Sequence, residues 1–293
     1  MDSLPVDLER ELFETAAICN PKMIPTLMRV CRRFRTWLEP LLYRVLIAHV
    51  YVPGPTISAA LSKPTSFLKT AVRHVFLRNG SITMKEANKK ILSSCEGIIN
   101  LTYSGTLDSE LLPLLDKMHL RKLDFSVPSS SMGASAWADS TLKHSLFRSV
   151  THLSLYQNVY ETPAHSSWQD WFKLASLPSL SHLSVSQELS AILPHALAEC
   201  PHLILAIILF WTMGPSQQDT ARQFAEGLAF TDPRLLVMVT MSILSKDWEI
   251  GARGGDDYWA RAEKFVAAER KSAPDVPRSI CYILDETNWN SGS

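Results

Sequence analysis

The chain has 293 residues, enough for one large core or for two domains. Hydrophobic residues make up 46% and charged residues 20%, which is typical of a soluble globular protein. The 29 basic and 29 acidic side chains cancel, which argues against a general electrostatic attraction to nucleic acid or to an acidic membrane.

The five cysteines are far apart and form no Cys-x-x-Cys pair. This argues against a disulfide framework or a thiolate zinc site and favours a reducing compartment. The N-terminus has no basic stretch followed by an apolar run, so it is not a secretory signal. The most apolar run, Leu203–Trp211, has nine residues, too few to span a bilayer. We expect a cytoplasmic and/or nuclear protein that binds no membrane.

The first 48 residues predict a small bundle of two or three helices. Apolar residues recur there at helical spacing, at Leu8, Leu12, Phe13 and Ala16 and then at Leu27, Val30, Cys31, Phe34 and Leu38. Pro21 separates the two sets and Pro40 follows the second. Because proline in an inner turn removes a hydrogen bond and clashes, we expect helices to end at both. The prolines and the glycine of residues 49–66 then predict a linker.

A short pattern recurs through residues 67–245. VTHLSLYQ (Val150–Gln157) and LSHLSVSQ (Leu180–Gln187) both read apolar-x-x-apolar-x-apolar. Further copies begin at Val72, Ile98, Leu120, Cys200 and Leu236. A strand with a helical return about every 20 to 30 residues is typical of a leucine-rich repeat. The alternative is an ordinary α/β domain in which such triplets coincide by chance.

The last region, residues 246–293, contains a predicted helix over 256–271. Asp256 and Asp257 suit a helix start, and Arg270 and Lys271 suit its end. We expect this helix to cover the open end of the repeat array, and we expect a loosely ordered tail from Pro274.

Side chains alternate between the two faces of a strand, so the residues between the apolar positions should form an open, concave face that binds a protein substrate. The residues predicted to bind substrate are His74, Arg78, Asn100, Lys122, Asp124, His152, Tyr156, His182 and His202.

Three of these histidines should form a ladder on neighbouring strands: His152, His182 and His202. A histidine ladder suggests a metal site or a pH switch. No Cys, Asp or Glu stands in the matching rows to complete a metal site, so we favour a polar rim and expect neither metal nor cofactor.

No catalytic motif is present: the chain has no G-x-S-x-G, H-E-x-x-H, P-loop or G-x-G-x-x-G. The basic run at Arg29, Arg32, Arg33 and Arg35 alternates with apolar partners on one predicted helix. It is therefore interpreted as a solvated helix face and not as a nucleic-acid contact. We expect a protein that is not an enzyme.

The segments LPVDLERELFETAA, from Leu4, and LMRVCRRFRTWLEPLLYR, from Leu27, resemble the F-box. The resemblance covers about the first 45 residues, and the remainder is similar to F-box-like proteins of mushroom-forming fungi. It implies docking on the Skp-type adaptor of a cullin-based SCF ubiquitin ligase. The residues it assigns to adaptor binding are Leu4, Pro5, Leu8, Leu12, Phe13, Val30, Cys31 and Phe34.

Together these patterns predict an α/β protein in four parts. They are an N-terminal helical F-box (1–48), a linker (49–66), an irregular leucine-rich-repeat-like solenoid (67–245), and a C-terminal capping helix with a tail (246–293). The expected function is substrate recognition within an SCF-type E3 ligase. The alternatives are a non-catalytic interaction scaffold unrelated to ubiquitylation and, third, an enzyme with an unrecognised site.

Overall fold

The computed structural model describes residues 4–48, 55–80, 82–128, 134–157, 167–211, 215–229, 232–240, 244–272 and 281–285. The chain divides into two compact units, Met1–Leu101 and Thr102–Ser293. Among the described residues, nine strands follow one another in chain order in a parallel sheet, β1 to β9.

The first unit is built mainly from helices. They are α1 (Val6–Cys19), η1 (Pro21–Met23), α2 (Ile24–Leu27), α3 (Arg32–Leu42), α4 (Pro55–Leu61), α5 (Thr65–Ala71) and α6 (Ile82–Ser94). Strand β1 (Val45–Ile47) pairs in parallel with β2 (His74–Arg78). Strand β3 (Asn100–Ser104) begins at the end of this unit.

Of the two prolines expected to end helices, Pro21 follows a helix end and Pro40 does not. Helix α1 ends before Pro21, as expected. Pro40 lies inside α3, which continues to Leu42, so the prediction of a helix end at Pro40 is wrong. Pro40 has no N–H to donate to the carbonyl of Thr36, near the middle of α3, and the helix continues for only two residues beyond it.

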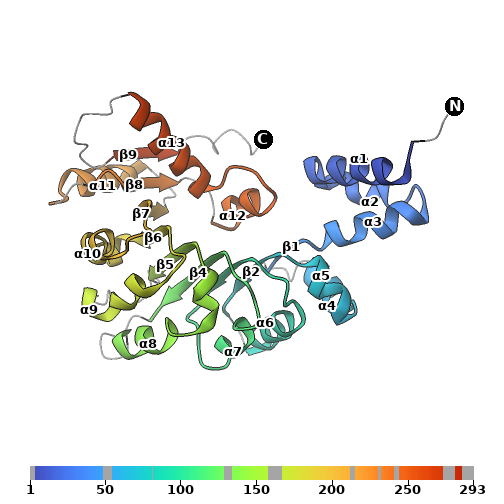
Figure 1. Ribbon diagram of the computed structural model, residues 1–293, viewed down its shortest axis with the longest axis horizontal. Helices are drawn as coiled ribbons and strands as arrows, with labels where there is room; N and C mark the ends of the chain where they lie inside the picture. Colours follow the sequence, from blue (N-terminus) through green and yellow to red (C-terminus); the bar gives the residue numbers. More distant parts are fainter. Residues whose placement is uncertain are drawn as a thin grey trace. The chain divides into compact units, whose positions relative to one another are not determined.

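The second unit alternates strands with helical returns. Its strands are β4 (Lys122–Val127), β5 (His152–Gln157), β6 (His182–Ser186), β7 (Leu205–Trp211), β8 (Leu235–Thr240) and β9 (Cys281–Asp285). Its helices are α7 (Leu112–Leu115), α8 (Ala134–Thr141), η2 (Ser145–Ser149), α9 (Trp168–Trp171), η3 (Phe172–Ser176), η4 (Gln187–Ile192), α10 (Leu193–Glu199), α11 (Pro215–Glu226), α12 (Leu244–Ala252) and α13 (Tyr258–Ser272). Helices α8, α9 and α10 follow one side of the strands in Figure 1.

The register of β4, β5 and β6 confirms the alignment of three copies of the sequence pattern. Leu123 lies opposite Leu153, and Leu153 lies opposite Leu183. All three side chains are buried. The recurring apolar triplet therefore marks equivalent positions on neighbouring strands.

One face of the sheet packs on the returning helices. Phe125 of β4 lies 5.7 Å from Trp137 of α8 and 6.3 Å from Phe147 of η2, measured between ring centroids. Phe210 of β7 lies 5.5 Å from Phe224 of α11 in the same way. Along their strands, Phe125 and Phe210 alternate with residues that point to the opposite face of the sheet.

The other face is covered as well, by α13. One buried cluster joins the two: Leu205, Ile207, Leu209, Leu236 and Met238 of the strands, and Tyr258, Trp259 and Ala262 of α13. Because both faces are buried, β7 reads LAIILFW and β8 reads LLVMVT, apolar at almost every position. This is the sequence signature of a doubly covered parallel strand.

The expected architecture, an F-box followed by a leucine-rich-repeat solenoid with a capping helix, is therefore wrong. The structure has a single parallel sheet with flanking helices, an α/β arrangement. Helix α13 lies on a face of the sheet and does not cap its end. The chain continues into β9, which pairs with β8 in parallel through Leu236 and Cys281. The face expected to be open is covered at β7 and β8.

The sixth and seventh copies of the pattern were placed in the wrong register. His182 lies opposite Leu205, so β7 begins after His202. Leu183 lies opposite Ala206, and Ala206 lies opposite Leu235 and not opposite Val239. Met241, the last residue of the seventh copy, lies outside the described residues. An unbroken apolar run fits the triplet in several frames, so it cannot specify the register.

Candidate functional site

Exposed apolar side chains are concentrated on the N-terminal helices. Nine large hydrophobic side chains are exposed in the described parts of the chain, and seven of them lie between Leu4 and Val30. Leu8 and Leu12 stand one turn apart on α1, with Leu12 58% exposed. Val30, just before α3, is 64% exposed. The concentration of exposed apolar side chains on these helices makes them a candidate interface.

Six of the eight residues assigned to adaptor binding are on the surface. They are Leu4, Pro5, Leu8, Leu12, Val30 and Cys31. Of the other two, Phe34 lies in the core of the helices and Phe13 is half-buried against it. Phe34 is only 5% exposed, and its ring centroid lies 3.9 Å from that of Phe13. These two rings pack α1 against α3, and Phe34 presents little surface to a partner.

A second group of candidate residues lies on the sheet face of the second unit. His152 of β5 and His182 of β6 are opposite each other in register. Their rings stack with centroids 4.0 Å apart and planes 2° apart. The indole of Trp259, from α13, stands perpendicular to both at 5.2 and 5.9 Å. His202 is exposed outside the strand, so the expected ladder has two members and not three.

Glu263 adds a carboxylate to the two histidines. Its Oε1 lies 2.9 Å from Nε2 of His182 and 3.8 Å from Nε2 of His152. Glu263 stands four residues after Trp259 on α13, and so on the same helix face. Glu263 lies on a helix, so a comparison of equivalent strand positions does not include it. An acidic residue in line with the apolar face of a predicted helix was the signal that could have identified it.

Lys122 and Asp124 lie beside the histidines on the same face. Nζ of Lys122 donates to Oδ2 of Asp257 at 2.8 Å. Asp124 is buried and accepts a hydrogen bond from the hydroxyl of Thr102 at 2.6 Å. Burial raises the pKa of Asp124 to about 7, against the effects of that hydrogen bond and of the Lys122 charge. Asp124 is therefore part of the interior and not of an open binding face.

The start of α13 is held by two aspartates. Oδ1 of Asp257 accepts from the backbone N–H of Ala260 at 3.0 Å, the geometry of a helix N-cap. Oδ2 of Asp247 accepts from the backbone N–H of Tyr258 at 3.0 Å. Oδ1 of Asp247 also accepts from Nη2 of Arg261 at 2.6 Å. These bonds place Trp259 and Glu263 over the histidines.

The remaining predicted substrate residues are dispersed. His74, Arg78 and Asn100 belong to the first unit, where Asn100 is buried and the other two are half-buried. Tyr156 is half-buried in the second unit, and its hydroxyl donates to the carbonyl of Tyr103 at 3.0 Å. Within the second unit, the structure brings together Lys122, Asp124, His152 and His182 on one face of the sheet.

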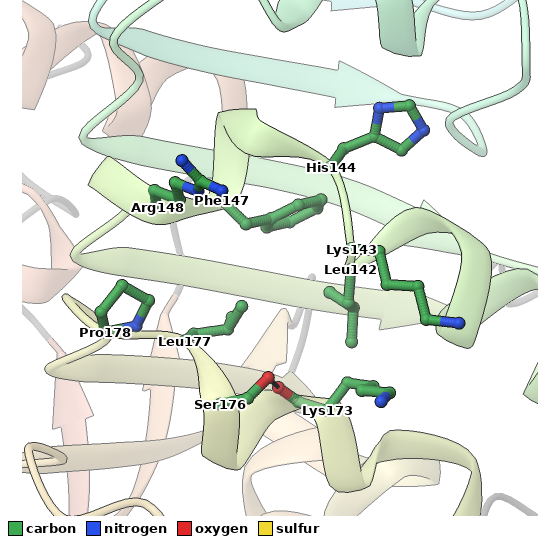
Figure 2. Close-up of a pocket in the computed structure, with 9 residues that line it drawn as sticks. All are labelled: Leu142, Lys143, His144, Phe147, Arg148, Lys173, Ser176, Leu177 and Pro178. Carbon is green, nitrogen blue, oxygen red and sulfur yellow. Dashed lines mark hydrogen bonds between the residues drawn. The ribbon is translucent and has the colours of Figure 1, made fainter.

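A shallow pocket of about 310 Å³ lies beside η2 and η3 (Figure 2). Figure 2 shows Arg148 at one end of it and Lys143 and Lys173 at the other. Both lysines pair with Asp139, Lys173 at 3.8 Å. The hydroxyl of Ser176 donates to the backbone carbonyl of Lys173 at 2.7 Å, so it is not oriented as a nucleophile.

A serine, a histidine and an aspartate lie close together beside this pocket but do not form a catalytic triad. Nδ1 of His144 lies 2.8 Å from Oδ2 of Asp116, and the hydroxyl of Ser145 donates to Oδ1 of the same carboxylate at 2.9 Å. Burial raises the pKa of Asp116, but these bonds and that from the Leu146 N–H outweigh it and lower the pKa. Because Ser145 bonds to the carboxylate and not to the imidazole, these three residues lack the contact that activates a serine.

Within the described ranges, no helix has the length and apolar character needed to cross a membrane. No protein-family model matches the chain, and no curated protein sequence matches it.

Proposed function

We propose that the N-terminal helices bind a Skp-type adaptor and that the chain is the substrate-recognition subunit of an SCF-type E3 ubiquitin ligase. The observation that carries the proposal is the exposed apolar group at Leu4, Leu8, Leu12 and Val30. It coincides with residues that the F-box resemblance assigns to adaptor binding. The Skp-type adaptor is the occupant that this resemblance specifies.

The energetics of such a surface support an adaptor interface. Burying apolar surface contributes about 25 cal/mol per Å², and a fully buried leucine contributes about 1.5–3 kcal/mol. A few central side chains usually carry most of the binding free energy. Leu8 and Leu12, adjacent on one face of α1, are the expected centre. Phe13 and Phe34 contribute indirectly, by fixing α1 against α3.

The division of labour follows from the same proposal. The chain has no catalytic step of its own, and ubiquitin transfer takes place on other subunits of the cullin-based ligase. The second unit holds a protein substrate. The protein works in the cytoplasm and/or the nucleus.

The test is co-purification of the full chain with a fungal Skp-type adaptor. The variant Leu4→Ala/Pro5→Ala/Leu8→Ala removes three exposed side chains and no core contact. The matched control is Ile204→Ala, another exposed apolar side chain, in the second unit. We expect the adaptor to be retained by the parent chain and the control and lost by the triple variant. A folded parent chain that retains no adaptor contradicts the proposal and favours an interaction scaffold outside ubiquitylation.

A further inference from the structure

The group formed by His152, His182 and Glu263 contains three metal-ligand atoms close together. One imidazole nitrogen from each histidine and one carboxylate oxygen lie within 4.8 Å of one another. The two histidines come from neighbouring strands and Glu263 from α13. Helix and sheet therefore bring three donor atoms together at this point, beside the indole of Trp259.

The histidine tautomers follow from the neighbouring hydroxyls. The Thr151 hydroxyl donates to the carbonyl of Arg121 at 3.0 Å, so its oxygen accepts from Nδ1–H of His152 at 2.9 Å. The Ser181 hydroxyl donates to the carbonyl of Thr151 at 3.2 Å, so its oxygen accepts from Nδ1–H of His182 at 2.8 Å. Each neutral ring thus carries its proton on Nδ1 and a lone pair on Nε2. Hydrogen bonds of this kind orient histidines that bind metals.

These tautomers place three acceptors against one another. Nε2 of His182 lies 2.9 Å from the Glu263 carboxylate, and this buried nitrogen has no geometrically assigned hydrogen bond among the described groups. The His182 side chain is only 6% exposed, so water does not readily satisfy it. A cation shared by the three atoms removes this conflict.

Burial disfavours the charged form of both rings. Burial lowers the pKa of His152 to about 3, with help from His182 and Lys122. Burial also lowers the pKa of His182, which the Glu263 carboxylate opposes and the Lys122 charge reinforces. The Lys122 ammonium would repel a cation, but it is paired with Asp257 at 2.8 Å.

We propose that His152, His182 and Glu263 form a binding site for a divalent transition metal, with zinc as the expected ion. Two imidazoles and one carboxylate are a common zinc donor set, with a fourth position left for water or another ligand. Glu263 is 49% exposed, so its carboxylate can be reached from solvent. The proposal does not depend on adaptor binding.

Ligation requires a small rearrangement of the two rings. Zinc lies about 2.0–2.2 Å from each ligand, so two ligand atoms of one ion are at most about 4.4 Å apart. Because the Nε2 lone pair lies in the ring plane, two parallel rings cannot both direct it at one ion, so they must open by rotation about χ2, a torsion with a broad minimum in histidine. The half-exposed Glu263 can move with them.

The test is calorimetric titration of zinc into the untagged full chain at pH 7, with the exposed thiols of Cys19 and Cys31 alkylated so that they cannot bind the ion. The variants are Glu263→Gln and His182→Gln. The matched control is His202→Gln, an exposed histidine that lies outside the site. Circular dichroism checks that each variant is folded.

We expect one zinc ion per chain, at least tenfold weaker binding in both site variants, and binding within twofold of the parent in the control. A zinc-dependent rise of the melting temperature should follow the same order. Weakening in folded Glu263→Gln supports the site even where His182→Gln fails to fold. No binding by the parent chain, or unchanged binding in folded Glu263→Gln, overturns it.

Discussion

The hydroxyl of Thr102 donates a hydrogen bond to Oδ2 of Asp124 at 2.6 Å, while Oδ1 of the same buried carboxyl has no hydrogen-bond partner among the described groups. Burial is the largest cause of the raised Asp124 pKa of about 7, and the Asp257 and Asp247 carboxylates reinforce it. An unfolded aspartate titrates near pH 3.9, roughly three units lower.

This difference makes stability depend on pH in a definite direction. Between about pH 4 and pH 7 the folded state holds the Asp124 proton and the unfolded state has released it, so the free energy of unfolding falls as pH rises. Asp124→Asn should raise it at pH 8 by about 1–4 kcal/mol and change it little at pH 4. Urea denaturation at both pH values measures this. Asp139→Asn, at an exposed carboxylate, is the control; an equal effect of Asp124→Asn at both pH values would show that titration is not the cause.

Replacing only one partner of the buried ion pair between Arg261 and Asp247 should strongly lower the free energy of unfolding. Asp247 is fully buried, and burial raises its pKa although the Arg261 charge opposes this. Arg261→Met leaves the carboxylate unpaired and should lower the free energy of unfolding by about 3–5 kcal/mol. Arg261→Met/Asp247→Asn should recover part of the loss. A double variant less stable than the single one in denaturant titrations would contradict this reasoning.

Core and surface residues of the N-terminal helices should differ sharply in their effect on stability. Phe34→Ala creates a cavity beside Phe13 and should cost about 3–5 kcal/mol. Leu12→Ala changes an exposed side chain and should alter stability by no more than about 0.5 kcal/mol. Thermal unfolding followed by circular dichroism compares the two. Similar losses would mean that Leu12 is covered within the chain.

The covered sheet face can be tested through Trp259. This side chain is 2% exposed and contacts both histidine rings. Trp259→Ala should lower the free energy of unfolding by about 3–5 kcal/mol and reduce the hydrogen-exchange protection of α13. Phe172→Ala, at an exposed ring, is the control. A loss no larger than that of the control would mean that α13 does not cover the sheet.

The strand registers that could be predicted are those with one apolar and one polar face. In β4 to β6 the apolar triplet alternates with Lys122, His152 and His182, so only one frame fits. In β7 every position from Leu205 to Trp211 is apolar, so the pattern fits several registers and the predicted one is wrong. Uniform apolarity predicts burial on both faces, and it should have indicated a covering helix.

The candidate site was predicted only in part because its members come from separate elements. His152 and His182 share a strand motif, and their pairing follows from it. Glu263 reaches them from a helix about 80 residues after His182, a contact that no local pattern contains. The exposed group at Leu8 and Leu12 could be anticipated because helical spacing places both on one face of α1. The burial of Phe34 depends on the packing of α1 against α3, which the spacing does not specify.

The most direct test of adaptor binding is an isothermal titration of a fungal Skp-type adaptor into the full chain and into Leu8→Asp, with Ile204→Asp as the control. A charge placed in a desolvated apolar interface is strongly unfavourable, whereas the same charge on a free surface is not. We predict one-to-one binding that Leu8→Asp weakens at least about 100-fold and Ile204→Asp leaves unchanged. Equal affinities of the parent chain and Leu8→Asp, or no binding by a folded parent chain, would contradict the proposed function.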